Sequence, residues 1–492
     1  MNKKLLSGNE AIARGAYEAG VKVACSYPGT PATEINEALV GHKEIYTEWS
    51  ANEKVALEIA FGACYAGKRA IVSMKHVGLN VAADPLFTIS YAGVNSGLVI
   101  VSADDPGIFS SQNEQDNRNY AKFAKIPMLE PSDSQEAKDF TKLAFDISEK
   151  YDTPVLLRLT TRVSHSKSIV ELGQRKESQK EIKKDIKKYV MIPSHAKPRH
   201  VFVEERLKKL EDLSNKINKI EYNNYDIGII TNGISYQYAK EVMPNASFLK
   251  LNMSYPLPKK LITEFSKKVK KLYVIEELDP FIEEQVKALG VNCIGKEKFP
   301  ICGELSPSMI DSILNNKTYS KIEDVLPKRL PAWCNGCPYN SLFAALKELD
   351  LNVIGDIGCY TLAALEPYNA LDVQINMGLS IGASFGVEKV SKEKNIAVIG
   401  DSTFVHSGIT ALIDIFNNKS TGTVIIIDNG GTAMTGMQPY PKVDFAKLAK
   451  AIGIKNIVKI NSKSSIKSVI ENEVNKKELS VIVYEEPCLL GK

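Results

Sequence analysis

The chain has 492 residues and a mass of 54.2 kDa, and its 62 basic and 58 acidic residues leave a formal net charge of +4. So small an excess gives no general attraction to nucleic acid or to an acidic membrane surface, and we expect neither as a partner. The length exceeds what one hydrophobic core organises, so three domains of about 100 to 170 residues are expected.

The N-terminal residues include lysines but lack the apolar core of a signal peptide. No apolar run approaches the roughly 18 residues that a membrane-spanning helix needs. We therefore expect a cytoplasmic protein whose eight cysteines stay reduced and form no disulfides. Packing, metal binding and catalysis are the remaining roles for these thiols.

Strand and helix patterns alternate from residue 1 to about residue 165. Strands are predicted within 21–28, 69–74, 97–106 and 153–162, and a helix within 32–41. This alternation is typical of a parallel sheet covered by helices. Residues 166–222 are Lys-rich, with charges of alternating sign around a Leu/Ile stripe, which predicts a solvated helical linker between domains.

Two further α/β domains are predicted, one from 223 to 322 and one from 323 to 492. Strands of the second are expected within 225–233, 246–258 and 271–280, and strands of the third within 352–360, 396–403, 423–431 and 479–487. The Asn-Gly turn near residue 233 is weak evidence for a nucleotide site, and packing is the favoured explanation. The predicted fold class is therefore α/β, with three consecutive doubly wound domains.

Two strands of the third domain end on side chains with oxygen atoms. The run 400–431 reads GDSTFVHSGITALIDIFNNKSTGTVIIIDNGG, so Asp401 and Asn429 follow two strands with one helix between them. In an open parallel sheet, ligands bind beyond the carboxyl ends of the strands. A carboxylate, an amide oxygen and a backbone carbonyl beside Gly430 or Gly431 suit magnesium, and glycines at both ends allow the backbone to approach a diphosphate.

This pair of strand ends resembles the thiamine diphosphate motif, in which a Gly-Asp pair and a downstream Asn clamp magnesium and the cofactor diphosphate. The alternative is two ordinary turns, because Asp, Asn, Gly and Ser are the usual turn residues. The run EWSANEKVALEIAFGACYAGKRAIVSMKHVGLN in the first domain is similar to the pyrimidine-binding domain of thiamine enzymes, with Glu53 as the matching ring carboxylate. The other interpretation of Glu53 is a carboxylate that stabilises a helix N-terminus.

Four cysteines belong to the same predicted domain as the Asp-Asn pair. Cys334 and Cys337 lie in the loop CNGCP, Cys359 at the strand end GDIGCY, and Cys488 at the strand end EEPCLL. Four thiolates from strand ends and one loop suit an iron-sulfur cluster, or a zinc ion if the site is only structural. The other four cysteines are scattered singly in strand and helix patterns, and are predicted to be packing residues.

The chain is identified as a member of the 2-oxoacid:ferredoxin oxidoreductases, similar to the large, thiamine-bearing subunits of the indolepyruvate type over nearly its whole length. The most specific stretches are SGNEAIARGAYEAGVKVACSYPGTPATEI, KHVGLNVAADPLFT, SADDPGIFSSQNEQDNRNYAKFAKIPMLEPSDSQEA, GDIGCYTL, GDSTFVHSGI and DNGGTAMTGMQPYP. The resemblance assigns the three domains a pyrimidine-binding, a transketolase C-terminal-like and a diphosphate-binding fold.

The resemblance implies that an aryl 2-oxoacid adds to thiamine diphosphate, loses carbon dioxide and gives two electrons singly to a nearby [4Fe-4S] cluster, and that coenzyme A takes the acyl group. It also implies a small second subunit, ferredoxin or a ferredoxin-like subunit as electron acceptor, and a dimeric core. The implied cluster ligands are the four cysteines named above.

The same resemblance assigns roles to further residues. Magnesium is assigned to Asp401, Asn429 and Gly431. Cofactor contacts are assigned to Glu53, His76, Gly400, Asp401, Ser402, Asn429 and Gly431. The catalytic group comprises Glu53, Thr30, Arg118 and His406. Thr30 and Arg118 are expected to meet the substrate carboxylate, since a hydroxyl and a guanidinium fork suit that group. His76 and His406 either bind phosphate or handle protons, or are structural histidines.

The sequence departs from the family pattern in two places. Members usually continue after the EEPC strand into a ferredoxin-like tail with two CxxCxxCxxxC runs, whereas this chain stops at Lys492. Electrons are then expected to leave through a separate protein, unless the chain is a shortened form or the chemistry is not oxidative. In addition, Tyr339 stands where the family more often has His, which removes a phosphate contact. A non-oxidative thiamine decarboxylase or carboligase and a zinc-stabilised non-enzyme remain the alternatives.

Overall fold

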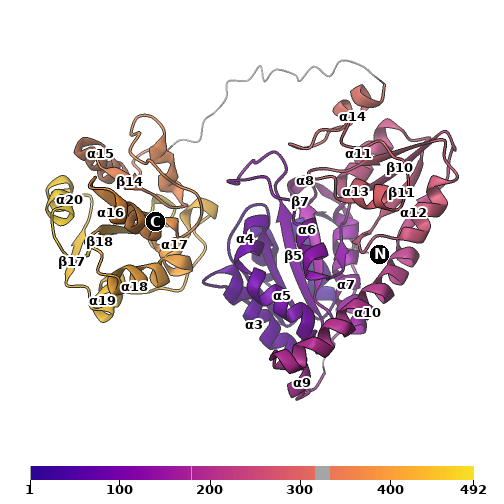
Figure 1. Cartoon of the computed structure of the whole chain (residues 1–492), viewed down its shortest axis with the longest axis horizontal. Coiled ribbons are helices and arrows are strands. Elements are labelled where there is room, and N and C mark those ends of the chain that lie inside the picture. The colour runs from indigo at the N-terminus through magenta and orange to yellow at the C-terminus, as the bar shows by residue number, and fades with distance from the viewer. Residues whose placement is uncertain (1, 179, 316–332, 492) are drawn as a thin grey trace. The chain divides into compact units, whose positions relative to one another are not determined.

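The protein is described by a computed structural model that covers residues 2–178, 180–315 and 333–491. The chain divides into two compact units, Met1–Glu323 and Asp324–Lys492. The predicted boundary between the second and third domains, at residues 322 and 323, lies outside the described residues. In both units, parallel sheets are flanked by helices, which confirms the predicted α/β fold class (Figure 1).

The larger sheet of the first unit has, among the described residues, seven strands in the order β12-β6-β7-β5-β4-β2-β3. The strands are β2 (Val23–Ser26), β3 (Tyr46–Trp49), β4 (Ala70–Lys75), β5 (Leu98–Asp104), β6 (Met128–Leu129), β7 (Val155–Thr160) and β12 (Met253–Tyr255). All pairs are parallel except β12 with β6. Because β12 comes from the second predicted domain, the first two predicted domains share a sheet.

Helices cover both faces of this sheet with apolar side chains. The helices are α1 (Gly8–Glu18), α2 (Thr33–Leu39), α3 (Glu53–Tyr65), α4 (His76–Val81), α5 (Ala83–Ala92), α6 (Arg118–Ala124), α7 (Ser134–Tyr151) and α8 (Thr161–His165). One core packs α1, α2 and α7 against the sheet. The other packs α3 and α5 against it and continues into the second sheet of the unit. A separate antiparallel pair is formed by β1 (Lys3–Ser7) and β8 (Lys167–Glu171).

The Lys-rich segment contains α9 (Ile186–Tyr189) and the long helix α10 (Pro193–Ile217). α10 is not solvated on all sides, because Val203, Arg206 and Leu210 are fully or almost fully buried. The Arg206 guanidinium donates to the carbonyl oxygens of Asp152 at 2.6 Å and Ser90 at 2.8 Å. The helix is therefore part of the packed unit.

The second sheet of the first unit has four strands within the described ranges, in the order β13-β10-β11-β9. These are β9 (Lys219–Glu221), β10 (Ile227–Asn232), β11 (Ser247–Leu251) and β13 (Lys271–Ile275), accompanied by α11 (Gly233–Val242), α12 (Lys259–Ser266), α13 (Phe281–Ala288) and α14 (Pro307–Leu314). One face of this sheet packs against the core that continues from the seven-stranded sheet. A separate core, which includes residues of α11 and α14, covers its other face.

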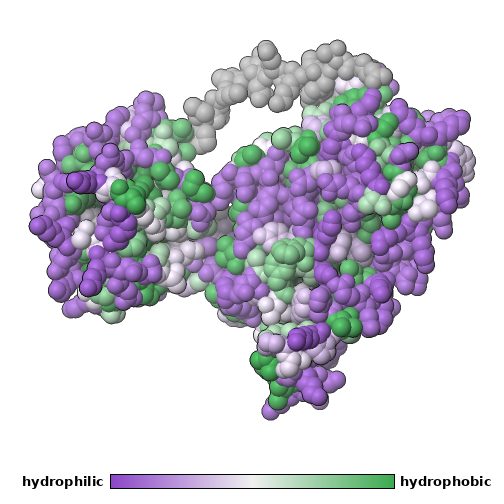
Figure 2. All heavy atoms as spheres, viewed as in Figure 1, coloured by the Kyte–Doolittle hydropathy of each residue, from purple (hydrophilic) through white to green (hydrophobic). Residues whose placement is uncertain are grey.

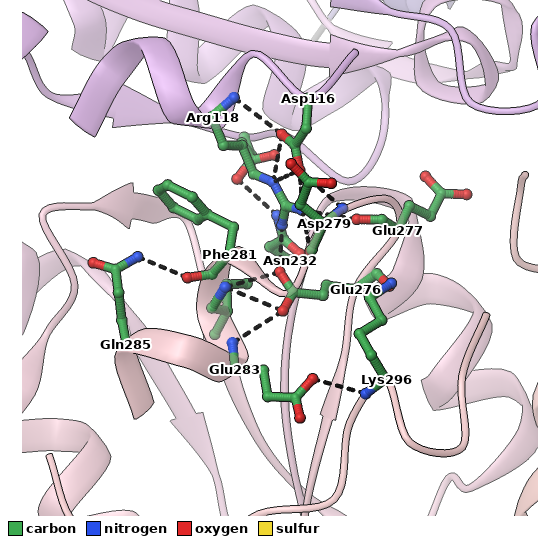
Figure 3. Close-up of polar contacts among 12 residues, drawn as sticks. Asp116, Arg118, Asn232, Glu276, Glu277, Asp279, Phe281, Glu283, Gln285 and Lys296 are labelled. Carbon is green, nitrogen blue, oxygen red and sulfur yellow. Dashed lines mark hydrogen bonds and ion pairs between the residues drawn. The ribbon is translucent and has the colours of Figure 1, made fainter. Parts of the chain in front are cut away.

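Buried charges join the two sheets of the first unit. Arg118, at the start of α6, binds Asp116 at 2.5 Å and reaches across to Glu276 beyond the end of β13, also at 2.5 Å (Figure 3). Its guanidinium also donates to the carbonyl oxygens of Glu277 and Asp279. All of these charged side chains except Asp279 are buried. The contact between the two sheets therefore depends on ion pairs that are shielded from solvent.

The second unit contains a parallel sheet that has, in the part of the chain that is described, five strands in the order β14-β15-β16-β18-β17. The strands are β14 (Asn352–Ile354), β15 (Asn395–Gly400), β16 (Thr423–Asp428), β17 (Asn456–Ile460) and β18 (Ser480–Glu485). The helices are α15 (Asn340–Leu349), α16 (Leu379–Val390), α17 (Asp401–Thr403), α18 (Ile409–Asn417), α19 (Phe445–Ile452) and α20 (Ile466–Val474). α15 and α20 cover one face, while α16, α18 and α19 cover the other.

Hydrophilic residues occupy most of the face seen in Figure 2, with hydrophobic patches between them. Several large apolar side chains are nevertheless exposed, among them Ile186 of α9 and Phe123 of α6. No helix among the described residues combines the length and the apolar character required to cross a lipid bilayer.

The buried carboxyl group of Glu277 predicts how the stability of the first unit depends on pH. Burial raises the pKa of Glu277 from 4.5 to about 7. The folded chain therefore holds a proton that the unfolded chain releases between those values, so this contribution to stability is complete below about pH 4.5 and is lost as the pH rises through about 7. Glu277→Gln is expected to remove this decline, which amounts to at most about 1.4 kcal/mol per pH unit.

The free energy of unfolding should be measured by urea denaturation from pH 4.5 to 8, with hydrogen exchange of the β10 and β13 amides as a readout confined to the first unit. Glu284→Gln on α13 is the control, because the Glu284 side chain is exposed and its loss is expected to change stability by less than about 0.5 kcal/mol. Equal pH profiles for wild type and Glu277→Gln would contradict the prediction.

Candidate functional site

Asp401 and Asn429 follow neighbouring strands of the second unit, because β15 and β16 pair in parallel. The backbone N–H groups of Asn429 and Gly430 donate to Asp401 Oδ2 at 3.1 and 2.9 Å. The Ser402 N–H donates to Asp401 Oδ1 at 2.6 Å. The structure thus brings the two residues into direct contact at the carboxyl edge of the sheet, where ligands of parallel sheets bind.

The Asp401 carboxylate is in an environment that would favour a nearby cation. Its side chain is buried, and burial raises the pKa of Asp401 to about 6 despite three backbone N–H donors. A positive ion close by would favour the charged form and reverse this rise. Asp401 Oδ1 accepts one of these hydrogen bonds and keeps a further lone pair for such an ion, whereas Oδ2 already accepts two.

Asn429 is held in place through both ends of its amide. The Gly431 N–H donates to Asn429 Oδ1 at 3.0 Å, and Asn429 Nδ2 donates to the hydroxyl of Tyr339. A methyl group at Gly431 would lie 2.6 Å from Cε of Met437, so the Met437 side chain would have to move to admit it. Tyr339, which the sequence suggested only as a lost phosphate contact, therefore positions Asn429.

His406 lies in an unusual turn directly after Asp401. The helix α17 continues into the π-helical turn Phe404–Gly408. Such turns are rare in proteins as a whole, and those that occur are often found at functional sites. His406 is buried, and its Nδ1 lies 2.6 Å from Oγ of Ser407. Gly400, at the end of β15, donates its N–H to the hydroxyl of Tyr360 at 3.0 Å.

Asp356 is a buried carboxylate of the second unit that the sequence did not single out. It lies just past the end of β14 and accepts the N–H groups of Ile357 at 2.9 Å, Gly378 at 2.7 Å and Ser380 at 3.1 Å. These contacts fix the start of α16. The available signal was the Gly-Asp pair of GDIG, which has the same form as the Gly-Asp pair at residues 400 and 401.

The four predicted cluster cysteines line one apolar pocket of the second unit. The pocket is lined by Cys334, Cys337, Cys359 and Cys488 together with Trp333, Pro338, Tyr339, Leu362, Ala433, Leu489 and Leu490. Burial raises the pKa of Cys359 to about 11, and the charges of the other three thiols, when ionised, add to the rise. Separated by up to 154 residues in sequence (488 − 334), the four thiols belong to one local environment.

Metal binding is nevertheless not evident from the side-chain positions. Among residues 2–178, 180–315 and 333–491, no group of three or more His, Cys, Asp or Glu side chains is arranged to hold a metal ion. All eight cysteines are free thiols.

Glu53 is the first residue of α3 in the first unit and is buried. Asn52 caps the helix by accepting the Val55 N–H at 2.9 Å. A methyl group added to Gly78, in α4, would lie 2.5 Å from Oε1 of Glu53. The α4 backbone therefore lies directly against the carboxylate, and the absence of a side chain at Gly78 is what makes room for it.

His76 begins α4 and is fully buried. Its Nε2 lies 3.0 Å from Oδ1 of Asn113, while its Nδ1 has no hydrogen-bond partner within the described part of the chain. Burial lowers the pKa of His76. The ring is therefore favoured in its neutral form, which leaves one buried nitrogen for a ligand.

Thr30 ends the YPGT turn after β2 and is half-buried. Its carbonyl oxygen accepts the Ser110 hydroxyl at 3.3 Å. The Ser110 N–H in turn donates to Asp105 Oδ2 at 2.8 Å. A loop beyond β5 therefore holds the turn that carries Thr30.

The structure does not support the predicted contact of Arg118 with substrate. The Arg118 side chain is fully buried, and its guanidinium is bound by the carboxylates of Asp116 and Glu276. A guanidinium so paired has no exposed fork for a further carboxylate. This pairing could not be predicted from local pattern, because Glu276 lies 158 positions further along the chain.

Comparison with known proteins matches the family model described as "Pyruvate flavodoxin/ferredoxin oxidoreductase, thiamine diP-bdg" to residues 14–226, and that described as "Thiamine pyrophosphate enzyme, C-terminal TPP binding domain" to residues 356–484. Indolepyruvate oxidoreductase subunit IorA of Archaeoglobus fulgidus is 41% identical over 99% of this chain and 87% of its own length. The Pyrococcus horikoshii subunit of the same name is 39% identical over 99% of the chain and 86% of its own. The chain belongs to the IorA family.

Among solved structures, the fold of this IorA family member is similar to that of a 2-oxoglutarate:ferredoxin oxidoreductase from Magnetococcus marinus with 2-oxoglutarate, coenzyme A and succinyl-CoA bound. The TM-score is 0.55 at 18% identity, over 64% of this chain and 65% of that one. At that identity the likeness shows the fold alone. The two thiamine-binding models cover the segments that contain Glu53 on one side and Asp401 with Asn429 on the other.

The three N–H groups around Asp356 predict that this carboxylate stabilises the second unit. Asp356→Ala would leave buried donors without an acceptor, so the free energy of unfolding is expected to fall by roughly 2 kcal/mol or more. Chemical denaturation with hydrogen exchange of the α16 amides measures the effect. Asp414→Ala on the exposed side of α18 is the control and should change stability by less than about 0.5 kcal/mol. Equal stability of the two variants would refute this role.

Proposed function

We propose that this chain is the thiamine diphosphate-bearing subunit of an oxidoreductase that decarboxylates an aryl 2-oxoacid of the indolepyruvate kind. The acyl group would be transferred to coenzyme A, and the two electrons would pass through one [4Fe-4S] cluster to ferredoxin. The observation that supports this proposal most directly is that one compact unit carries both the Asp401–Asn429 contact and a pocket lined by four cysteines.

The residues at the two strand ends suit magnesium and a diphosphate. Asp401 and Asn429 would supply side-chain oxygens to the ion, and the backbone at Gly431 would supply a third, the ligand chemistry that magnesium prefers. Gly400 and Ser402, which precede the π-helical turn, would contact the cofactor diphosphate. His406 would lie beside this group, where a neutral or charged imidazole binds phosphate or transfers a proton.

Glu53 would bind the pyrimidine ring. Bound thiamine diphosphate supplies a carbon nucleophile that attacks the 2-oxo group and then holds the electrons left by decarboxylation. A buried carboxylate hydrogen-bonded to a ring nitrogen would favour the tautomer that removes the proton from this carbon. His76 would contact the cofactor through its unpartnered Nδ1, and the Thr30 hydroxyl would meet the substrate carboxylate.

The thiol pocket would hold the four-iron cluster. In a four-iron cluster each thiolate binds a different iron, so the sulfur atoms stand further apart than four ligands of one ion. Four thiols that line one apolar pocket supply the number of ligands that such a cluster needs. Apolar walls such as Trp333, Leu362 and Leu489 would limit water around the cluster, a property that tunes reduction potential.

Membership of the family supports the remaining assignments that we propose. Residues 1–165 would form the pyrimidine-binding domain, 166–222 the helical segment, 223–322 the transketolase C-terminal-like domain and 323–492 the diphosphate-binding domain with the cluster. A small second subunit and a ferredoxin or ferredoxin-like protein would be the partners, with a dimeric core. A reducing compartment such as the cytoplasm would keep the cluster cysteines available.

The contact between Gly78 and Glu53 predicts a sharp loss of activity from one methyl group. Gly78→Ala should displace the carboxylate and lower thiamine-dependent turnover of an aryl 2-oxoacid by about a hundredfold, because small misplacements of positioning groups cost that much. Glu53→Gln should abolish turnover. Activity is measured as dye reduction by the anaerobic complex with its second subunit.

Gly62→Ala is the matched control, because Gly62 lies in the same helix as Glu53 and an added methyl group meets no atom within 4 Å. It should keep wild-type turnover. Wild-type activity in Glu53→Gln, or a wild-type complex without thiamine-dependent turnover of any 2-oxoacid, would exclude the proposed function.

Anaerobic purification tests the cluster. About four irons per chain and a brown chromophore are expected, and replacing Cys359 with Ser should lower the iron content. Cys293→Ser is the control, since that cysteine lies in the first unit. An iron-free protein that releases an aldehyde from an arylpyruvate without an electron acceptor would instead establish a non-oxidative decarboxylase, and zinc without turnover would establish a structural role.

A further inference from the structure

Lys75 is the last residue of β4, at the carboxyl edge of the seven-stranded sheet of the first unit. β4 lies between β2, which leads into the YPGT turn, and β5, which leads into the loop that holds that turn. Carboxyl edges of parallel sheets are where ligands bind. The position therefore places a positive charge between two loops of the candidate site.

The Lys75 side chain runs across the YPGT turn. A methyl group at Gly29 would lie 3.0 Å from Cδ and 3.1 Å from Cγ of Lys75, so the lysine stem packs on the turn backbone. Its ammonium donates to the carbonyl oxygen of Ser110 at 2.8 Å, and the Ser110 hydroxyl donates to the carbonyl of Thr30. Lys75 and Thr30 are thus held by the same exposed residue.

This lysine has no ion-pair partner among the described residues, unlike Arg118 and Arg158, two buried arginines of the unit that are paired with carboxylates. The carboxylates that attract it are Asp105 and Glu53, and neither lies within ion-pair distance. One Asp105 oxygen is already used by Ser110 and Ser111, and the other by Thr161.

The Lys75 ammonium has three N–H donors. Its hydrogen bond to the Ser110 carbonyl uses one of them and leaves two for a ligand. Burial lowers the pKa of Lys75, so the charged form is not fully compensated by its surroundings. An anion that approaches this edge would supply the missing compensation. Because Thr30 is half-exposed and Ser110 exposed, such an anion can reach the group from solvent.

We propose that Lys75 binds the carboxylate of the 2-oxoacid substrate, together with the Thr30 hydroxyl, and selects anionic over neutral ligands. The inference rests on the proposed function. It fills the role that Arg118 cannot take. A single ammonium and a hydroxyl would hold the carboxylate while the acyl portion extends toward the reacting carbon. A charge-assisted hydrogen bond in a half-buried site is strong enough to discriminate.

The test compares an anionic and a neutral analogue in the thiamine-loaded complex. Phenyllactate keeps the carboxylate but has no 2-oxo group to react, and its methyl ester lacks the charge. Their competitive inhibition constants, and dissociation constants from calorimetry, give an anion preference. In Lys75→Met this preference should fall by about ten- to a hundredfold, with KM for phenylpyruvate raised more than kcat is lowered.

Three further measurements separate recognition from a structural role. Lys75→Arg keeps a cation and should retain part of the anion preference. Lys209→Met, on an exposed position of α10, should leave it unchanged. The dissociation constant of thiamine diphosphate, determined by calorimetry, should be the same in Lys75→Met and wild type, because the lysine is assigned to substrate and not to cofactor.

An unchanged anion preference in a folded Lys75→Met complex that still turns over substrate would overturn the inference. Weakened thiamine diphosphate binding with an unchanged preference would also overturn it and assign Lys75 to the cofactor. If Lys75→Met does not fold, Lys75→Gln is used under the same criteria. A wild-type complex without thiamine-dependent turnover marks instead the failure of the proposed function.

Discussion

The structure depends on carboxylates buried just beyond the ends of parallel strands, each of which must find donors for its oxygens. Asp356 follows β14 and Asp401 follows β15, and each accepts three backbone N–H groups, one from the next residue and two from another segment of the unit. In the first unit, Glu276 follows β13 and accepts N–H groups from the start of α13 as well as the guanidinium of Arg118. Each such group determines the path of the loop that follows it, and so the shape of that edge of the sheet.

These buried carboxylates also determine which cations remain for ligands. Arg118 and Arg158 neutralise several of the acidic groups between the two sheets of the first unit. Burial raises the pKa of Asp104 and of Glu277 to about 7, which indicates that two arginines do not balance all of them. The guanidinium groups of Arg118 and Arg158 are thus occupied by buried carboxylates, whereas the ammonium of Lys75, at the edge of the sheet, is proposed to bind an anion from solvent. Stability and binding use separate cations here.

The sequence was sufficient for features that depend on local pattern. The α/β class follows from alternating strand and helix periods, and the contact between Asp401 and Asn429 follows from two strand ends with one helix between them. Features that depend on distant pairing were not accessible. Arg118 resembles a substrate ligand in sequence, but Glu276, far along the chain, takes its charge. Gly78 gives no signal of its own, because its role is the space that it leaves for Glu53. Tyr339 supports Asn429 through a hydroxyl contact that no spacing rule predicts.

The edge strand β12 has a consequence for how the chain can be divided. It comes from the second predicted domain, yet it pairs with β6 in the sheet of the first, and Met253 lies in the core beside α1 and α7. A hinge between these two domains would have to break sheet hydrogen bonds, so they move as one body. A truncation after residue 222 would uncover the edge of β6 and leave Arg118 buried without Glu276. An expressed fragment of the first unit should therefore extend beyond α13.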